Sequence, residues 1–577
     1  MKTPNFDEAI KEYFSNLELD ENGGQWRVCR FSGNKFYVRP DDIAFYKAHQ
    51  VPLPTLSPNE RIRRKLAFQN SYNLFKIKSA YSGDSIISQY PSNTPFKVFG
   101  KTEYYGDKWN PEDYARNYDR NEKFFPQLQK LMLNVPKCNL NNNPNNIDSD
   151  YCNNSSSLKN CYLVFDAHSS EDSAYSISPF GSRNCFDCFD PFNCDTCYNC
   201  FESENLFHCY FVEYSKDCLY SYFLYDCRDC DHCFGSVNLR HKKYHFFNQP
   251  LTKEEYEAKM KEINLGDRNV LQEYITKFEE IKKKAFNKQD HNEKSINCSG
   301  EYLNNSKNCF SCYYEIGGEN LAYCIGGMAI RDSYDIVGGI EVESCYECWG
   351  RSDNYGNKFC DIASSQNMEY SVFCRNCHDC FGCDGLSNKS FCVFNKQYTE
   401  EDYNKLVDAI KTKMLADGEY GEFMPPELAY FPYNISIATS YLGYDNLEIA
   451  KKYGYKIEEV PENLYDIKEG VIDSQDVPAD IKDVGDDILS KVIFDRKNNK
   501  KFRYTKMELD FYRRNNLPLP LEHYSVRLAN LRKKFGSIVL NFYERNCDKC
   551  KKAIESTYTP EDERIVYCEE CYKQEIV

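Results

Sequence analysis

Small and apolar side chains recur along the middle of the chain with a fixed short spacing. From Cys161 onward, a polar residue followed by a small or apolar one returns about every twelve residues, and one interval, from Cys197 to Leu206, is shortened to nine. A second small or apolar residue follows three positions later, as Cys188 follows Cys185. A fixed short period predicts stacked identical units.

The three-residue spacing predicts a bend within each unit. Side chains alternate between the two faces of a strand, so residues three apart on a straight strand point to opposite sides. If both Cys185 and Cys188 face inward, the chain must turn between them, as it does at the corners of a narrow β-solenoid. The Asn and Asp residues before the cysteines suit a turn or a stacked amide ladder. The sequence leaves open whether twelve residues form a whole coil or half of one.

The repeat block occurs twice. The second copy starts at Asn308-Cys309, and its end aligns with the first copy without a gap, because Cys233-Phe234-Gly235 matches Cys380-Phe381-Gly382. Each copy is followed by a predicted helix with Thr252 or Thr399 at its N-cap and an acidic residue three positions on. The first of these helical stretches is expected to continue to about residue 294 as a solvated spacer.

The chain ends form a second duplicated pair. Phe45-Tyr46, followed by prolines and Arg61, resembles Phe511-Tyr512, followed by prolines and Arg527. The predicted fold class is therefore β-rich and multidomain, with two tandem cysteine-ladder β-solenoid blocks, helical spacers and duplicated end modules. The expected boundaries are 1–20 for an N-terminal helix, 21–110 for an N-terminal module that is a degenerate zinc ribbon, 111–149 for a connector, 150–250 for block 1, 251–296 for the helical spacer, 297–397 for block 2, 398–486 for a helix and acidic connector (acid-rich from 459 to 487), and 487–577 for a C-terminal zinc-ribbon module.

Composition limits the partners and the cellular compartment that we expect for the protein. The net charge of −16 argues against nucleic acid as a partner. The amino terminus has no apolar run of signal-peptide type, and no stretch has the length of a membrane span. We therefore expect an intracellular protein without membrane contact. In a reducing compartment its 30 cysteines should be thiols or metal ligands, not disulfides.

Four cysteines near the carboxyl end have the spacing of a zinc ribbon. Cys547 and Cys550 form one CxxC pair, Cys568 and Cys571 form another, and 17 residues separate the pairs. Each pair on a tight turn can turn both thiolates toward one ion. Four sulfurs close the tetrahedron and leave no position for water, so the predicted cofactor is a structural Zn²⁺.

The amino-terminal module has lost these ligands. Ser79, Ser82, Gly100 and Glu103 stand where the four cysteines stand at the other end. This copy must fold on its apolar residues without metal, which favours a packing or docking role for it.

The ladder cysteines have two interpretations. As small hydrophobes they would fill a narrow core, and as thiolates they would bind zinc or Cu(I). Packing is favoured because equivalent positions hold Leu206 and Leu321, which cannot bind metal. Three runs are dense enough to keep a metal or redox role open: Cys194/Cys197/Cys200, Cys227/Cys230/Cys233 and Cys374/Cys377/Cys380/Cys383.

No catalytic motif is found in the chain. It has no phosphate-binding loop, nucleophile elbow or metalloprotease motif. His208, His232 and His378 lie beside ladder cysteines, where a Cys/His pair is conceivable, but exposed side chains on the coils are the favoured interpretation. We expect no catalytic residues and no small-molecule substrate.

Several motifs together resemble a known family. They are Cys374 to Cys383 with Phe394-Asn395-Lys396-Gln397-Tyr398, then Gly418 to Leu428, Ile481 to Val484, and Glu508 to Tyr512 through the ribbon. The chain resembles large, cysteine-rich, uncharacterised bacterial proteins with a zinc-ribbon end. Members of this family carry more zinc-type cysteines near the amino end and before Phe502, where this chain has Cys29 alone. Some members carry an automatic label as CaiB/BaiF-type CoA-transferases, which no residue pattern here supports.

These observations favour a non-enzymatic structural or protein-interaction protein that assembles with protein partners or with copies of itself. The first alternative is a thiolate metal-binding or redox protein that uses the dense cysteine runs. The second is a nucleic-acid-associated zinc-ribbon protein, which the basic stretch from Arg513 to Lys534 keeps open.

Overall fold

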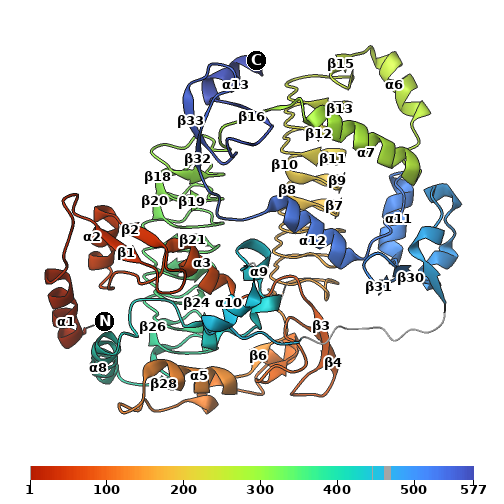
Figure 1. Ribbon diagram of the computed structural model, residues 1–577. Helices are drawn as coiled ribbons and strands as arrows, with labels where there is room; N and C mark the ends of the chain where they lie inside the picture. The colour runs from red at the N-terminus through yellow and green to blue at the C-terminus, as the bar shows by residue number, and fades with distance from the viewer. Residues whose placement is uncertain (1, 144, 445, 460–469, 577) are drawn as a thin grey trace. The chain divides into compact units, whose positions relative to one another are not determined.

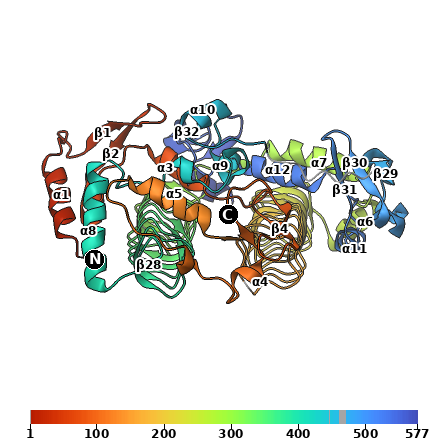
Figure 2. The same ribbon diagram turned by 90° about the horizontal axis from the view of Figure 1, so that it is seen from below.

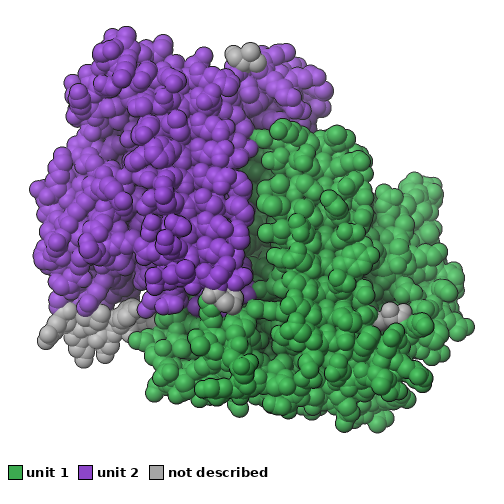
Figure 3. Space-filling view, turned by 180° about the vertical axis from the view of Figure 1, so that it is seen from behind, with its two compact units in different colours: residues 1–139, 290–460, 537–540 green, residues 140–289, 461–536, 541–577 purple. Residues whose placement is uncertain are grey.

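The computed structural model describes residues 2–143, 145–444, 446–459 and 470–576. The chain divides into two compact units, coloured separately in Figure 3. Unit 1 comprises residues 1–139, 290–460 and 537–540, and unit 2 comprises 140–289, 461–536 and 541–577. Unit 1 therefore combines the N-terminal module with block 2, and unit 2 combines block 1 with the C-terminal module.

Block 1 is a stack of parallel coils in unit 2 (Figure 1). Cys197 pairs with Cys209, and Tyr210 pairs with Tyr222, so each residue lies beside the residue one coil later. Side-chain acceptors follow the same period, since the Cys185 N–H donates to Ser173 Oγ and the Cys188 N–H donates to Ser176 Oγ, each twelve residues earlier. Twelve residues are thus one whole coil. The strands are β7 Arg183–Phe186, β8 Phe189–Phe192, β9 Asp195–Tyr198, β10 Phe201–Glu204, β11 Phe207–Glu213, β12 Tyr222–Tyr225, β13 Phe234–Val237, β14 His245–Phe246 and β15 Gln249–Pro250.

Block 2 repeats this arrangement in unit 1. Cys309 pairs with Leu321, and Cys380 pairs with Cys392, again in parallel. Seen from below in Figure 2, the coils of each block superpose as nested outlines. The strands are β17 Gly300–Glu301, β18 Lys307–Phe310, β19 Cys312–Tyr313, β20 Glu319–Ala322, β21 Ile340–Glu343, β22 Trp349–Gly350, β23 Ser352–Tyr355, β24 Asp361–Ala363, β25 Val372–Arg375, β26 His378–Phe381, β27 Ser390–Val393 and β28 Lys396–Gln397.

Every third residue of the coils has left-handed backbone geometry. Asn160, Leu163, Asp166 and Ser169 have φ between 49° and 54°, and the pattern continues through both blocks. The bend expected between Cys185 and Cys188 lies at Asp187, whose φ is 52°. The repeating unit is thus three residues: one at the corner, one inside and one that pairs with the next coil.

This three-residue period explains the interval of nine residues in the sequence. Cys197 pairs with Cys209 across an ordinary coil, so the coil containing Leu206 is not shortened. Leu206 lies three residues before Cys209, on the preceding side of the coil, in line with Cys194 and Cys218. Our interpretation of a shortened unit was therefore wrong, because the marker pattern moves from one side of the coil to its neighbour.

Asparagine and aspartate occupy many of the solvent-facing corners, and their side chains form ladders. Asn308 Nδ2 donates to Asn320 Oδ1 at 3.1 Å, and Asn320 Nδ2 donates to Asp332 Oδ1 at 2.8 Å. These two residue types tolerate left-handed geometry best among residues with a Cβ. The stacked amide ladder expected from the sequence is confirmed. Some buried corners hold an aromatic residue, as at Phe223 and Tyr370, both 0% exposed, and others hold an aspartate, as at Asp187 and Asp335.

Asparagine side chains also cap the first coil of each block. In block 1, Asn146 Oδ1 accepts the Leu158 N–H at 3.0 Å. In block 2, Asn292 Oδ1 accepts the Leu303 N–H at 2.9 Å. The Asn-rich run before Tyr151 supplies the cap of block 1, because amides can replace the backbone groups of a missing coil.

The end modules pack on the coils through aromatic contacts. In unit 1 the Phe45 ring stacks on Tyr334 with centroids 3.8 Å apart. In unit 2 the Phe511 ring stacks on Phe186 at 3.9 Å. The remaining elements of unit 1 are α1 Pro4–Ser15, β1 Gln25–Val28, β2 Lys35–Val38, α2 Pro40–Ala48, α3 Pro58–Leu66, β3 Phe75–Lys78, β4 Ser85–Ser88, β5 Val98–Phe99, α4 Lys101–Tyr104, η1 Pro111–Tyr114, α5 Phe124–Asn134, β6 Lys137–Cys138, α8 Glu400–Ala416, η2 Pro426–Leu428, η3 Tyr433–Ile435, α9 Ile437–Tyr441 and α10 Leu447–Lys452.

The predicted helices after each block begin where expected. Thr252 Oγ1 accepts the Glu255 N–H and Thr399 Oγ1 accepts the Asp402 N–H, both at 3.2 Å. The first stretch does not continue to residue 294 as one helix, because it breaks near Gly266 and restarts with Asp267 as a new N-cap. The elements of unit 2 outside block 1 are α6 Lys253–Glu262, α7 Arg268–Lys282, β16 Phe286–Lys288, β29 Val471–Asp473, η4 Ser474–Asp476, η5 Ile481–Asp483, η6 Asp486–Ser490, β30 Val492–Asp495, β31 Lys500–Phe502, α11 Lys506–Arg514, α12 Tyr524–Phe535, β32 Tyr543–Asn546, β33 Ala553–Ser556, β34 Ile565–Tyr567 and α13 Glu569–Glu575.

Two further expectations concern the connector and the membrane. The acid-rich connector was expected between residues 459 and 487; its residues 460–469 lie outside the described part of the chain, and the rest forms β29 and short 3-10 turns. Of the helices in the described ranges, none combines the length and the apolar character that crossing a bilayer requires.

Candidate metal centre

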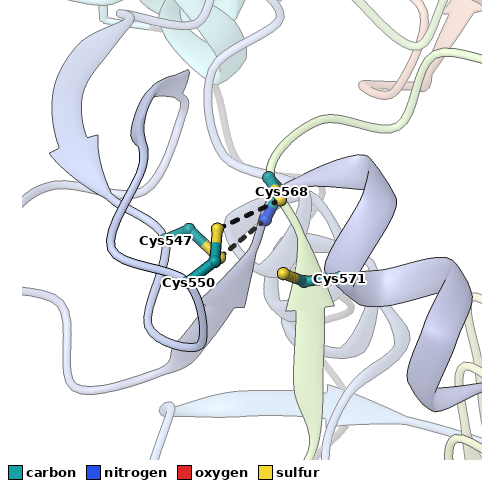
Figure 4. A group of neighbouring side chains, drawn as sticks. All are labelled: Cys547, Cys550, Cys568 and Cys571. Atoms are coloured by element: carbon teal, nitrogen blue, oxygen red, sulfur yellow. Dashed lines mark hydrogen bonds between the residues drawn. The ribbon is translucent and has the colours of Figure 1, made fainter.

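The four cysteines near the carboxyl end come together in unit 2. Their Sγ atoms all lie within 4.8 Å of one another, and Cys550 Sγ is 3.7 Å from Cys568 Sγ. Figure 4 shows Cys547 and Cys550 on the loop of a hairpin, opposite Cys568 and Cys571 at the start of α13. A Zn–S bond of about 2.3 Å places the sulfurs of a tetrahedron about 3.8 Å apart. The group is therefore close to the size of a tetrathiolate zinc site.

The backbone holds the first pair in a tight turn, which we call a knuckle. Cys547 N–H donates to Lys552 O at 2.8 Å, and Lys551 N–H donates to Cys547 O at 2.9 Å. Lys551 takes the left-handed geometry that this turn requires, with φ 63°. The turn joins β32 to β33, so the hairpin fixes both thiols before any ion is bound.

Backbone amides prepare Cys547 for metal binding. Burial by itself would raise the pKa of Cys547, but hydrogen bonds from the backbone amides of Cys568 and Cys550 outweigh it and lower the pKa to about 6. The Cys568 N–H lies 3.2 Å from Cys547 Sγ. Amide donors of this kind stabilise a thiolate, which is the form that binds metal.

The second knuckle, in unit 1, joins β3 to β4 with the same backbone bonds. Ser79 N–H donates to Asp84 O at 2.8 Å, and Gly83, with φ 82°, donates to Ser79 O at 3.0 Å. The Glu103 carboxylate lies among the positions that the metal ligands occupy in the first knuckle. Its Oε2 accepts a hydrogen bond from Ser79 Oγ and another, at 2.7 Å, from the Gly100 N–H. Burial opposes ionisation of Glu103, but hydrogen bonds from Ser79 and then Ser82 lower its pKa. The lost ligands are thus replaced by a hydrogen-bonded cluster.

Two further knuckles were missed in the sequence. Cys29 N–H donates to Asn34 O and Gly33 N–H donates to Cys29 O, both at 2.9 Å, between β1 and β2. In unit 2, Asn499 has φ 53° in the turn between β30 and β31, where Asp495 Oδ2 accepts the His523 N–H at 3.1 Å. Both turns share a five-residue sequence pattern that could have identified them. It has a polar or thiol residue, two residues of any type, a second polar residue, and then Gly or Asn.

The ladder cysteines take part in backbone hydrogen bonding inside the coils. Cys345 N–H donates to Ser333 Oγ at 3.0 Å, and Cys345 Sγ accepts the Asn357 N–H at 3.4 Å. Each thiol also donates to backbone carbonyls, as Cys185 does to Cys194 O at 3.6 Å. Many inward N–H groups donate to a side chain of the previous coil, as the Cys227 N–H does to Ser215 Oγ at 2.9 Å. Serine and cysteine alternate along the ladder because both are small and both can accept and donate.

The dense cysteine runs do not converge on a common point. Among the described residues, the four C-terminal cysteines form the group of three or more His, Cys, Asp or Glu whose ligand atoms lie close enough for one ion. Within the run that ends at Cys383, burial raises the pKa of Cys374. The hydrogen bond from Cys374 lowers the pKa of Cys377 to about 7. All thirty cysteines lie in the described ranges, and none forms a disulfide there.

The three histidines beside the ladder make other contacts. His232 Nδ1 lies 2.5 Å from Asp231 Oδ1, and His378 Nδ1 lies 3.0 Å from Asp379 Oδ2. The His208 ring stacks on Tyr220 with centroids 5.4 Å apart. These contacts fit the interpretation of exposed side chains on the coils.

We compared the chain with family models, with curated proteins and with solved structures, and none of them matches it.

Proposed function

We propose that this chain is a non-enzymatic scaffold with a structural Zn²⁺ at Cys547, Cys550, Cys568 and Cys571. The observation that carries the proposal is the closed group of four thiols, since four sulfurs leave no coordination position for water or substrate. Zinc would link the knuckle hairpin to α13, and binding of this kind contributes about 10–16 kcal/mol in small zinc units.

The two coil stacks supply the scaffold. We infer that they are tandem β-solenoids whose lumens are filled by serine, cysteine and aliphatic side chains, and that their long sides serve protein partners. The free thiols support a reducing, intracellular setting. The resemblance to zinc-ribbon-ended bacterial proteins remains a prediction and adds no activity.

Metal content tests the zinc proposal. The purified chain should hold about one zinc, and the Cys547→Ser/Cys568→Ser variant should hold none. The matched control is Cys185→Ser/Cys345→Ser, which changes two ladder cysteines and should retain the zinc. Zinc retained by the first variant would place the site elsewhere and overturn the proposal.

The alternative of a thiolate metal-binding or redox protein predicts a different metal content. It rests on Cys377, whose pKa of about 7 is brought near neutrality by Cys374. It predicts soft metal beyond one equivalent per chain, with a loss of that excess on Cys377→Ser. A constant metal content in that variant removes this alternative.

The nucleic-acid alternative rests on a basic stretch that is partly paired with acidic residues. Lys534 Nζ lies 2.7 Å from Glu213 Oε1, and Arg513 is paired with Asp486 at 2.5 Å. These acidic partners offset two of the basic side chains that a nucleic-acid backbone would need, which weighs against this alternative.

A further inference from the structure

Two duplicated hairpins differ at one edge. In unit 2, β30 is the central strand of a three-stranded sheet, with β29 parallel on one side and β31 antiparallel on the other. In unit 1, β1 occupies the place of β30, but its sheet has only β1 and β2 among the described residues. The edge of β1 that corresponds to the β29 side is therefore open.

The side chains of β1 are exposed where those of β30 are covered. Trp26 is 64% exposed and Val28 is 59% exposed, whereas Val492, in the place of Trp26, is 1% exposed. Trp26 and Val28 share one face because side chains alternate along a strand. Tyr37 extends this face, with its ring 5.1 Å from that of Trp26. A large apolar surface on an open strand edge is the usual mark of a docking site.

Unit 1 does not supply the missing strand. In unit 2 the added strand comes from the residues upstream of β30. The corresponding residues of unit 1 form α1, which is fixed against α8, because Asp408 accepts from the Phe6 N–H at 2.9 Å and from Asn5 Nδ2 at 2.6 Å.

The chemistry of the covering strand is visible in unit 2. Val471 and Ile472 pair with Val492 and Ile493, and the Asp473 carboxylate lies 2.7 Å from Arg496 Nε. The counterpart of Arg496 in unit 1 is Arg30, whose side chain is 49% exposed and binds Glu422 through one nitrogen at 2.8 Å. A guanidinium has five N–H donors, so Arg30 can bind a second carboxylate.

We propose that the open edge of β1 binds an extended segment of a partner protein, added as a parallel strand with two β-branched residues followed by an acid. Trp26 provides the apolar anchor, and the backbone of β1 provides the ladder hydrogen bonds. This inference rests on the proposed scaffold function and names the partner surface.

A synthetic peptide of residues 470–476, Gly-Val-Ile-Asp-Ser-Gln-Asp, is the direct probe, with a scrambled peptide as control. The full-length, zinc-loaded chain should bind it saturably, with a blue shift of the Trp26 fluorescence and slower amide exchange in residues 25–28. Trp26 is one of three tryptophans, so the signal is taken as the difference from Trp26→Thr.

Two lysine variants sharpen the test. Trp26→Lys places a charge on the edge and should weaken peptide binding by about tenfold or more. Ile296→Lys is the matched control, since Ile296 is 68% exposed on block 2 in the same unit, and binding should be unchanged. Absence of binding, or equal binding by both variants, overturns the proposal.

Self-association is the other decisive outcome. If the chain dimerises and Trp26→Lys abolishes the dimer, the occupant is a second copy and the partner segment is overturned. The metal content reports on the scaffold's zinc site independently, so failure of peptide binding with one zinc retained would overturn this inference and leave the proposed function standing.

Discussion

Arg61 in unit 1 and Arg527 in unit 2 each bind an aspartate at a left-handed corner of a coil. Arg61 Nε lies 2.9 Å from Asp335 Oδ1, and Arg527 Nη1 contacts Asp187 Oδ2. The two aspartates have φ of 58° and 52°. The duplication has thus preserved a buried arginine–carboxylate contact between an end module and a coil stack, together with the neighbouring aromatic stacks.

Removal of either arginine should therefore be costly. Arg527→Met leaves Asp187 and Glu508 buried without their cation, since Arg527 Nη2 also lies 3.1 Å from Glu508 Oε1. We expect the free energy of unfolding of this variant, measured in urea, to be about 3–5 kcal/mol lower than that of the original chain. Arg496→Met, which breaks the exposed pair with Asp473, is the control and should change stability by about 0.5 kcal/mol or less. Equal effects would contradict the buried role of Arg527.

The hydrogen bonds inside the coils predict that serine at position 345 destabilises the fold less than alanine does. Cys345→Ser keeps a small side chain that accepts the Asn357 N–H, whereas Cys345→Ala leaves that N–H without an acceptor and creates a small cavity. We expect Cys345→Ala to cost about 1–2 kcal/mol and Cys345→Ser to cost less. Chemical denaturation of the two variants decides this, and an inverted order would show that apolar packing dominates in the lumen.

The second knuckle should accept a metal if its ligands are restored. Ser79, Ser82, Gly100 and Glu103 occupy the four ligand positions, and a Cβ at Gly100 would meet no atom closer than 3.3 Å. Combined replacement of all four by cysteine should raise zinc from about one to about two per chain. The triple variant that keeps Gly100 is the control. An unchanged zinc content in the fourfold variant would mean that the knuckles share a turn but not a ligand geometry.

His523 should make stability depend on pH. Burial and the nearby Lys500 and Arg527 lower its pKa from 6.5 to about 4. The neutral Nδ1 accepts the Ser525 N–H at 3.1 Å at the start of α12. As the pH falls from about 6.5 toward 4, the unfolded chain binds a proton that the folded chain resists, so the free energy of unfolding falls by about 3 kcal/mol.

The matched variant for this effect is His523→Asn, which retains a good N-cap without a titrating group. The unfolding free energy of the variant should vary less than that of the original chain between about pH 7 and pH 4.5. An identical slope in both proteins would assign the pH dependence to other residues.

The sequence predicted much of the site and part of the fold. The C-terminal pairs CxxC predicted four converging thiols because thiol spacing and turn geometry are local properties, and the structure brings those thiols together. The parallel stacking and the bend at Asp187 followed from the spacing of Cys185 and Cys188. The helices after Thr252 and Thr399 followed from their caps.

The features that could not be predicted from the sequence depend on long-range contacts or on backbone geometry. The three-residue period is obscured because some buried corners hold Phe223 or Tyr370 in place of Asn or Asp. The pairing of each end module with the more distant block has no local signal. The knuckle at Asp495 escaped notice because a carboxylate and amides replace the thiols that mark such turns.

This crossed pairing has a consequence for synthesis on the ribosome. Residues 1–139 belong with residues 290–460, and the whole of block 1 is made between them. At about 5–20 residues per second, the aromatic surface of the first module waits roughly ten to thirty seconds for its partner coils. During that interval Phe45 and its neighbours lack the coils that cover them in the folded chain, so the order of the segments along the sequence sets how long this aromatic surface stays uncovered.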